Sequence, residues 1–219
     1  MKYNGQALQD KFVCEILKSK KNGFFLEIGS NDPIIINNTY VLEKELNWKG
    51  IMVEYKDKYL KDYKIHRQNS IHVIDDATNV NYLELFLQND VPKNIDYLQI
   101  DLEALNGSSL HVLEKLNNDV LDKYKFATIT FEHDIYHTNN YHIRKKSREI
   151  LKQRGYIFVF QDVGGSNTPF EDWYVHPALV DMEHVNYIID KNKEKYKNNV
   201  RVFDKSLVTE VINFNEIEY

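Results

Sequence analysis

The segment Phe24–Pro33, with the sequence FFLEIGSNDP, constrains the fold of this chain more than any other feature. An apolar run with Glu27 near its end is followed by one glycine and a polar turn. This pattern is typical of the first strand and the first strand–helix loop of a doubly wound α/β sheet. Ligands bind to such sheets in the crevice beyond the carboxyl ends of the strands. We therefore expect the binding site at that edge.

A second apolar run, 51–54, also ends in a carboxylate, Glu54. An acidic residue at the tip of the second strand is suited to bind the hydroxyls of a ribose. The first loop, however, contains only one glycine, Gly29. A dinucleotide-binding loop needs three, so that the backbone can approach the pyrophosphate.

The other residues of this loop are Ser30, Asn31 and Asp32, whose side chains suit an amine and a carboxylate better than a phosphate. A ligand with a ribose, an amino acid end and no phosphate fits both the loop and Glu54. The sequence therefore predicts that the cofactor is S-adenosylmethionine.

Size and composition predict a single soluble enzyme domain over residues 1–219. The apolar fraction of 42% and the charged fraction of 28% are ordinary for a globular protein, and the net charge of −5 argues against nucleic-acid binding. The single cysteine, Cys14, excludes an internal disulfide and fits a reducing, cytoplasmic location, and its apolar neighbours predict a buried thiol. No apolar stretch approaches the roughly 20 residues that span a bilayer, and the charged N-terminus is unlike a signal peptide, so we expect no membrane segment.

Strand and helix patterns alternate along the chain, which predicts a mostly parallel sheet with helices on both faces. We expect strands at Phe24–Ile28, Ile51–Glu54, Ile71–Ile74, Ile95–Asp101, Phe126–Phe131 and Tyr156–Phe160. We expect helices around 12–17 and at Thr39–Leu46, Lys58–Lys64, Tyr82–Gln88, Ser109–Leu116 and Ile143–Arg154. Ser108 is an expected N-cap, and Gly155 is an expected helix-ending glycine.

The alternation of strand and helix patterns weakens after Asp162. Residues 164–169 give a loop signal, and the following segment PFEDWYVHP, 169–177, is interpreted as a loop that closes one edge of the core. The alternative is a lid that contacts the substrate. Trp173 and Tyr174 could stack on a sugar ring, and buried packing at this edge of the core is the other interpretation of these two side chains. The lysine-rich run from Asp190 predicts a solvated helix face, and a last strand is expected at Leu207–Phe214.

Two further strand ends carry acidic residues. In the run 75–78, a carboxylate such as Asp76, next to Ala77, could accept a hydrogen bond from an adenine amino group. The alternative is a capping cluster for the helix that follows. Asp101 and Glu103 project to the same side of their strand, and two buried carboxylates require a partner such as a cationic ligand or a metal. A pair of solvated loop acids is the alternative.

The next strand leads into Glu132 and His133, which we expect to face Asp101 and Glu103 across the crevice. His133 has an unperturbed pKa of roughly 6.5, which suits a proton acceptor near neutrality. A hydrogen-bonded loop histidine is the alternative. Asp101, Glu132 and Asp162 together could form an oxygen-rich site for Mg²⁺ or Mn²⁺, although no compact ligand motif supports it.

Several motifs occur in series along residues 7–180. They are QDKFV (9–13), FFLEIGSNDP (24–33), NNTYVLEKE (37–45), WKGIMVEY (48–55), YLQIDLE (97–103) and TFEHD (130–134). Together they resemble the FkbM family of S-adenosylmethionine-dependent methyltransferases. Residues 181–219 form a C-terminal extension beyond this resemblance.

The resemblance implies a seven-stranded class I methyltransferase fold and O-methylation, often of a sugar hydroxyl. It implies cofactor contacts at Glu27, Gly29, Asn31, Asn38, Thr39, Glu54, Asp76 and Asp101. Many members of the family have a glycine soon after the acidic pair, whereas this chain has LEALNG at 102–107. The acceptor side of the site is therefore expected to differ.

We accordingly expect an O-methyltransferase that acts on a carbohydrate hydroxyl of a glycan or nucleotide sugar. Methyl transfer requires a group that removes the proton of this hydroxyl, and His133, Glu132 or a metal could do so. One alternative is a metal-dependent O-methyltransferase of a small non-sugar acceptor. Another is a cofactor-binding subunit without catalytic activity.

Overall fold

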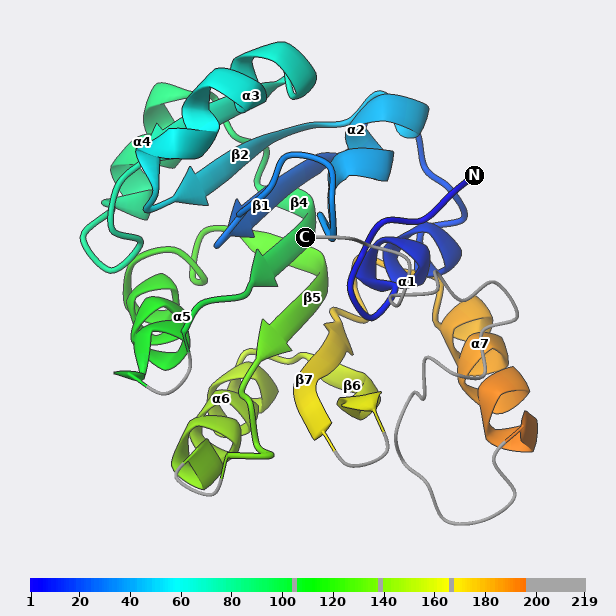
Figure 1. Ribbon diagram of the computed structural model, residues 1–219. Helices are drawn as coiled ribbons and strands as arrows, with labels where there is room; N and C mark the ends of the chain where they lie inside the picture. The colour runs from blue at the N-terminus through cyan, green and yellow to red at the C-terminus, as the bar shows by residue number, and fades with distance from the viewer. Residues whose placement is uncertain (104–105, 138–139, 166–167, 196–219) are drawn as a thin grey trace.

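The computed structural model describes residues 1–103, 106–137, 140–165 and 168–195 (Figure 1). The strands are β1 (Phe24–Ile28), β2 (Lys49–Glu54), β3 (Ser70–Ile74), β4 (Asn94–Ile100), β5 (Lys125–Glu132), β6 (Ile157–Gly165) and β7 (Thr168–Val175). The helices are α1 (Gln9–Ile16), α2 (Tyr40–Leu46), α3 (Leu60–His66), α4 (Tyr82–Gln88), α5 (Ser108–Asp119), α6 (Tyr141–Gln153) and α7 (Met182–Lys195). A short 3-10 turn, Asp57–Tyr59, precedes α3.

All seven strands form one sheet in the order β3-β2-β1-β4-β5-β7-β6. The first five strands of this order are parallel, whereas β7 is antiparallel to both β5 and β6. The chain starts in the middle of the sheet, winds outward to β3 and then returns to β4 on the other side of β1. The predicted doubly wound, mostly parallel seven-stranded sheet is confirmed.

Helices cover both faces of the sheet (Figure 1). Successive side chains of a strand point to opposite faces, and β1 shows this directly. Leu26 packs into an apolar cluster with residues of α4, α5 and α6, whereas its neighbour Phe25 packs with residues of α1, α2, α3 and α7. The two layers leave the carboxyl ends of β1, β2, β4 and β5 at one common edge.

The segment predicted as an edge loop or a lid is strand β7, and both interpretations were wrong. It pairs between β5 and β6. Trp173 and Tyr174 are buried in the core, which confirms buried packing for these two side chains. A strand that is buried on both faces has no alternation of polar and apolar residues, so its pattern does not show a strand. The proline Pro169 near its start added to the loop signal.

Local predictions had mixed outcomes. Gly155 follows α6 with a positive φ of 84° and donates its N–H to the carbonyl of Lys152, as expected for a helix-ending glycine. Ser108 is not the N-cap, because Gly107 occupies that position and Ser108 is the first helical residue. Cys14 is buried, and burial raises the pKa of its thiol to about 12.

Helix α7 extends to Lys195, the last described residue, so the described part of the lysine-rich run is helical as expected. The strand predicted at Leu207–Phe214 lies outside the described residues. In the part of the chain that the structure describes, no helix has the length and apolar character needed to cross a membrane.

Candidate cofactor and acceptor site

A cavity of about 990 Å³ lies at the common edge where β1, β2, β4 and β5 end. Most of the residues predicted for the site line it. They are Glu27, Gly29, Ser30, Asn31, Asp32, Asn38, Glu54, Asp76, Ala77, Asp101, Glu103 and Glu132. Thr39, His133 and Asp162 do not line it. The structure therefore brings twelve of the predicted residues to one cavity and leaves three outside its wall.

Gly29 brings the first loop against the end of β4. Its φ is 87°, and a Cβ atom at this position would lie 1.8 Å from the carbonyl oxygen of Asp101. No other residue type fits there, because of both the positive φ and this close approach. The N–H of Gly29 donates to the carbonyl of Val53 at 2.9 Å, which also fixes the loop to β2.

Glu54 connects the end of β2 to the first loop. One carboxylate oxygen accepts the backbone N–H of Asn31 and the other accepts that of Lys56, each at 2.8 Å. A carboxylate has about four acceptor positions. Glu54 can therefore hold the loop and still accept hydrogen bonds from ligand hydroxyls in the cavity.

Asp76 shapes the turn after β3. Its carboxylate accepts hydrogen bonds from the backbone N–H and the hydroxyl of Thr78, and these bonds lower the pKa of Asp76. The cap of α4 is Asn81, whose side chain accepts the N–H of Glu84. Asp76 therefore does not cap this helix, and it lines the cavity beside Ala77.

Glu27 forms part of the cavity wall, although its side chain is almost completely buried. Burial raises the pKa of Glu27 to about 7, while Arg67, Thr39 and Asn37 act in the opposite direction. A buried carboxylate that opens to a cavity favours a positively charged ligand group, because such a group would offset the cost of desolvation.

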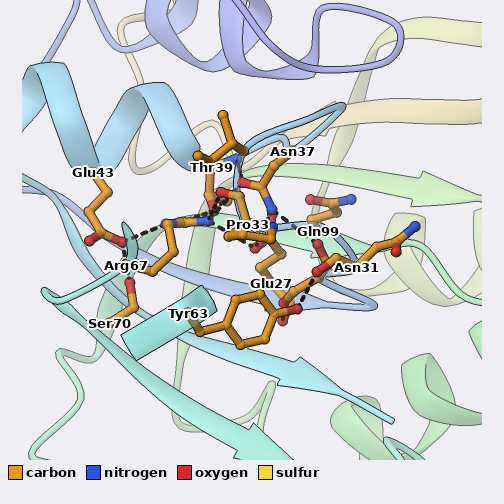
Figure 2. Close-up of polar contacts among 12 residues, drawn as sticks. Glu27, Asn31, Pro33, Asn37, Thr39, Glu43, Tyr63, Arg67, Ser70 and Gln99 are labelled. Carbon is orange, nitrogen blue, oxygen red and sulfur yellow. Dashed lines mark hydrogen bonds and ion pairs between the residues drawn. The ribbon is translucent and has the colours of Figure 1, made fainter. Parts of the chain in front are cut away.

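Arg67 was not predicted, yet it organises the wall behind Glu27 (Figure 2). Its guanidinium is completely buried and binds side chains of α2 and of the loop before it. Thr39, predicted as a cofactor ligand, instead accepts a hydrogen bond from Arg67 Nη2 at 2.6 Å. No sequence pattern distinguishes a buried arginine from the commoner exposed one, so this residue was missed.

Two amide oxygens in the cavity wall lack hydrogen-bond donors among the described residues. Gln99 donates its Nε2 to Asp101 Oδ2 at 3.1 Å, which orients its Oε1 as a buried acceptor without a partner. Asn38 Oδ1 is also buried without a partner. Buried polar atoms in native proteins are nearly always paired. These two oxygens therefore indicate a ligand that donates hydrogen bonds.

A group of carboxyls lies at the ends of β4 and β5, and we call Asp101, Glu132 and Asp134 the open carboxyl cluster. All three line the cavity. Burial raises the pKa of Glu132 well above its ordinary value, and the neighbouring charge of Asp101 and a hydrogen bond with it add to this effect. Burial and Asp101 also raise the pKa of Asp134. Glu132 and Asp134 therefore hold a proton to higher pH than ordinary carboxyls do.

His133 does not join this cluster. Its ring is completely buried, its Nδ1 accepts the backbone N–H of Ile135 at 3.2 Å, and its Nε2 lies 3.5 Å from Asp172 Oδ1. Glu132 is the last residue of β5 and lines the cavity, whereas His133, which follows the strand, is not among the residues that line it. The histidine contributes to the core instead.

Asp162 and Asp172 lie in a second cluster, together with Arg144 and Arg148. We call these four residues the arginine-paired cluster. Arg148 binds both oxygens of Asp172 at 2.7 Å and Asp162 at 2.9 Å, and Arg144 also binds Asp162. Although burial opposes it, these hydrogen bonds from Arg148, with His133 nearby, hold the pKa of Asp172 well below its usual range.

The predicted metal trio Asp101, Glu132 and Asp162 is not brought together. Strand β7 inserts between β5 and β6, which separates Asp162 from the cavity. Among the described residues, the group with suitable spacing for a metal is His133, Asp162 and Asp172. The guanidinium groups of Arg144 and Arg148 already neutralise these carboxylates, so this group offers a poor site for a cation.

Comparison with solved structures identifies the fold. A protein from Clostridium thermocellum assigned as an rRNA methylase matches with a TM-score of 0.52 and 13% identity, over 80% of this chain and 98% of the other. One from Klebsiella pneumoniae assigned as an O-methyltransferase matches with a TM-score of 0.51 and 12% identity, over 77% and 79%. A methyltransferase from Pyrococcus furiosus gives 0.50 and 12%, over 80% and 88%. The chain has the class I methyltransferase fold. No protein-family model and no curated protein sequence matches it.

Proposed function

We propose that this protein is an S-adenosylmethionine-dependent O-methyltransferase that acts on a carbohydrate hydroxyl. The observation that carries the proposal is the placement of Glu27, Glu54 and Asp101. These residues lie at or directly after the ends of three adjacent strands, and they line one cavity of about 990 Å³. In a doubly wound sheet, this edge is where ligands bind.

The donor and acceptor groups of the cavity suit this cofactor. Glu54 offers carboxylate oxygens for ribose hydroxyls. Glu27 and the unpaired oxygen of Gln99 offer acceptors for an ammonium group. The first loop contains one glycine, Gly29, and no glycine-rich turn for a pyrophosphate. Asp76 and Ala77 line the part of the cavity that follows β3, where an adenine would extend.

When bound, S-adenosylmethionine supplies a methyl group on a positively charged sulfur. The chain must then orient the acceptor hydroxyl for in-line attack and remove its proton, which leaves the oxygen as the acceptor of the methyl group. We assign proton removal to Asp101 and Glu132, because they line the cavity and share a hydrogen bond. His133, the earlier candidate, has no access to the cavity.

The charge of the cavity favours an uncharged or cationic acceptor over a nucleotide sugar. At the ends of β4 and β5, the ionisable lining residues are the open carboxyl cluster and Glu103. Lys56 is the one lysine or arginine among the described lining residues, and it follows Glu54 on the opposite side. A phosphate near four carboxyl groups would be repelled. We therefore propose a neutral glycan hydroxyl as the acceptor.

Two measurements test this function. Calorimetry should show that S-adenosylhomocysteine binds and that NAD does not, and preference for NAD would overturn the cofactor assignment. Transfer of labelled methyl from S-adenosylmethionine should then be compared between neutral oligosaccharides and nucleotide sugars. Methylation of nucleotide sugars alone would overturn the acceptor class and leave the cofactor assignment in place.

A further inference from the structure

Arg67 lies between two buried carboxylates. It follows α3, and its side chain is completely buried. Its Nε donates to Glu43 Oε2 at 2.8 Å, and its Nη1 lies 3.9 Å from Glu27 Oε2. The positive charge of Arg67 therefore pairs directly with Glu43 of α2 and interacts at longer range with Glu27 of the cavity wall.

The same guanidinium holds the loop that precedes α2. Nη1 donates to Asn37 Oδ1 at 2.8 Å and to the carbonyl of Pro33 at 3.3 Å, and Nη2 donates to Thr39 Oγ1. Asn37 in turn donates its Nδ2 to Glu27 Oε2 at 3.3 Å and to the carbonyl of Ser30 at 3.0 Å. Figure 2 shows these contacts gathered around the guanidinium of Arg67, with Asn37 between it and Glu27.

We propose that Arg67 is a positioning residue for the amino acid end of the cofactor: through its charge and through Asn37, it keeps Glu27 ionised and oriented toward the cavity. Arg67 itself does not line the cavity, so it acts without touching the ligand. This inference rests on the proposed function, since Glu27 is the wall carboxylate assigned to the ammonium group.

The surroundings of Glu27 explain why it needs this support. The ionisable groups around Glu27 are Arg67 from the end of α3, the phenols Tyr63 of α3 and Tyr97 of β4, and the carboxylates Glu54 and Asp101 of the same cavity wall. Arg67 is the one positive charge among them. Burial raises the pKa of Glu27 to about 7 even with Arg67 present. Removal of an opposite charge within about 4–6 Å raises a carboxyl pKa by roughly 1–3 further units.

A positioning role through ionisation predicts a pH signature that a purely structural role would not produce. In the wild type, cofactor affinity should increase as the pH rises through about 7, because Glu27 loses its proton. Without Arg67, this midpoint should move to higher pH. The loss of affinity should then be large at pH 6.5 and small at pH 8.5. A structural defect would instead lower affinity equally at both pH values.

The test uses the full chain and S-adenosylhomocysteine as the probe, with binding measured by calorimetry from pH 6 to pH 8.5. Arg67→Gln is expected to weaken binding at pH 7 by about fivefold to fiftyfold, which is the loss of ionised Glu27 when its pKa rises by about 1–2 from about 7. Arg67→Lys keeps the charge and should restore most of the affinity. Glu27→Gln should bind weakly and without this pH dependence. Arg154→Gln, which removes contacts to Asn117 and Asp122 away from the cavity, is the matched control.

Because Arg67→Gln leaves two buried carboxylates unpaired, it could fail to fold. Glu27→Gln and Arg67→Lys then carry the test, since neither adds a buried unpaired charge. Carbon-13 NMR of the Glu27 carboxyl in the ligand-free wild type and Arg67→Lys measures the titration without any cofactor. A pH dependence that survives in Glu27→Gln, or a loss of affinity equal at all pH values, would overturn the proposal. Absence of S-adenosylhomocysteine binding would overturn the proposed function, while the NMR titration would still decide the role of Arg67.

Discussion

Two clusters of carboxyl side chains lie near strand β5, and they differ in whether arginine side chains neutralise them. In the arginine-paired cluster, Asp162 and Asp172 are bound by two arginines of α6. In the open carboxyl cluster, Asp101, Glu132 and Asp134 form no salt bridge with a described lysine or arginine, and all three line the cavity. The fold thus provides arginine partners for the arginine-paired cluster, whereas the open carboxyl cluster faces the cavity without them.

This difference indicates that the arginine-paired cluster stabilises the fold, whereas the open carboxyl cluster is available for proton transfer or ligand binding. Bidentate arginine–carboxylate pairs are geometrically fixed and strong, so the arginine-paired cluster holds α6 against β6 and β7. Carboxyls that lack a cation keep raised pKa values and can exchange protons or bind a positive ligand group. The pKa of Glu132 is raised and that of Asp172 is lowered, in agreement with this distinction. The following predictions test it, from the largest expected effect to the smallest.

Loss of an ion pair in the arginine-paired cluster should cause the largest decrease in the free energy of unfolding among the variants considered below. Arg148→Met removes the guanidinium from Asp172, which is completely buried. Breaking a buried ion pair by removing one partner costs about 3–5 kcal/mol. Denaturant unfolding should therefore show a loss of about 3 kcal/mol, the lower end of that range, because Arg148 is partly exposed. Arg154→Met, at a more exposed ion pair, is the control and should cost less. Equal losses would show that Asp172 does not depend on Arg148.

Glu132→Gln should affect chemistry without affecting the fold. The amide keeps the shape of the side chain but cannot carry the proton of the acceptor, and a positioned acid–base group is typically worth about a hundredfold or more in turnover. Methyl-transfer assays should show this loss, while calorimetry shows almost unchanged affinity for S-adenosylhomocysteine. If turnover is retained, Asp101 alone removes the proton.

Glu54→Ala should weaken cofactor binding. Loss of a charged hydrogen-bond partner costs about 1.5–3 kcal/mol, which corresponds to about tenfold to a hundredfold in affinity. Calorimetry with S-adenosylhomocysteine measures this effect. Glu45→Ala, at an exposed carboxylate of α2, is the matched control and should bind like the wild type. Unchanged affinity in Glu54→Ala would remove Glu54 from the ribose site.

His133→Ala should have the smallest effect on turnover. The ring is buried beside Asp172 and outside the cavity, so its removal should reduce stability by about 1–3 kcal/mol through lost packing and hydrogen bonding. Turnover per folded molecule should stay close to the wild type. A hundredfold loss of turnover in a folded variant would restore His133 as the proton acceptor.

Asp172 also gives a pH test of the arginine-paired cluster. Its pKa is lower in the folded protein than in the unfolded chain. The stability that it contributes is therefore fully present above its unfolded pKa of about 3.9 and is lost as the pH falls below that value. Unfolding curves between pH 6 and pH 3 should show a decline in the wild type that is smaller in Asp172→Asn.

The sequence predicted the parallel half of the sheet well. The first strand, Phe24–Ile28, was predicted with the observed bounds, and Glu27 and Glu54 were placed correctly at the cavity. Short apolar runs that end in an acidic residue and a turn are local patterns, so they can be recognised from sequence alone.

The failures of prediction concern contacts between distant segments. The insertion of β7 between β5 and β6 moved Asp162 away from Asp101, and only the strand order shows this. The different placements of Glu132 and His133 could not be predicted, because β5 ends at Glu132 and the direction of His133 depends on the backbone after the strand. Arg67 lies far along the chain from Glu27, and its burial depends on tertiary packing.

The structure of the complex with S-adenosylhomocysteine tests the central claim most directly. We expect the ribose hydroxyls at Glu54, the amino group near Glu27 and Gln99, and the sulfur facing the open carboxyl cluster. The arginine-paired cluster and His133 should remain out of contact with the ligand. A complex in which the sulfur faces His133, or in which the ligand lies outside this cavity, would contradict the account.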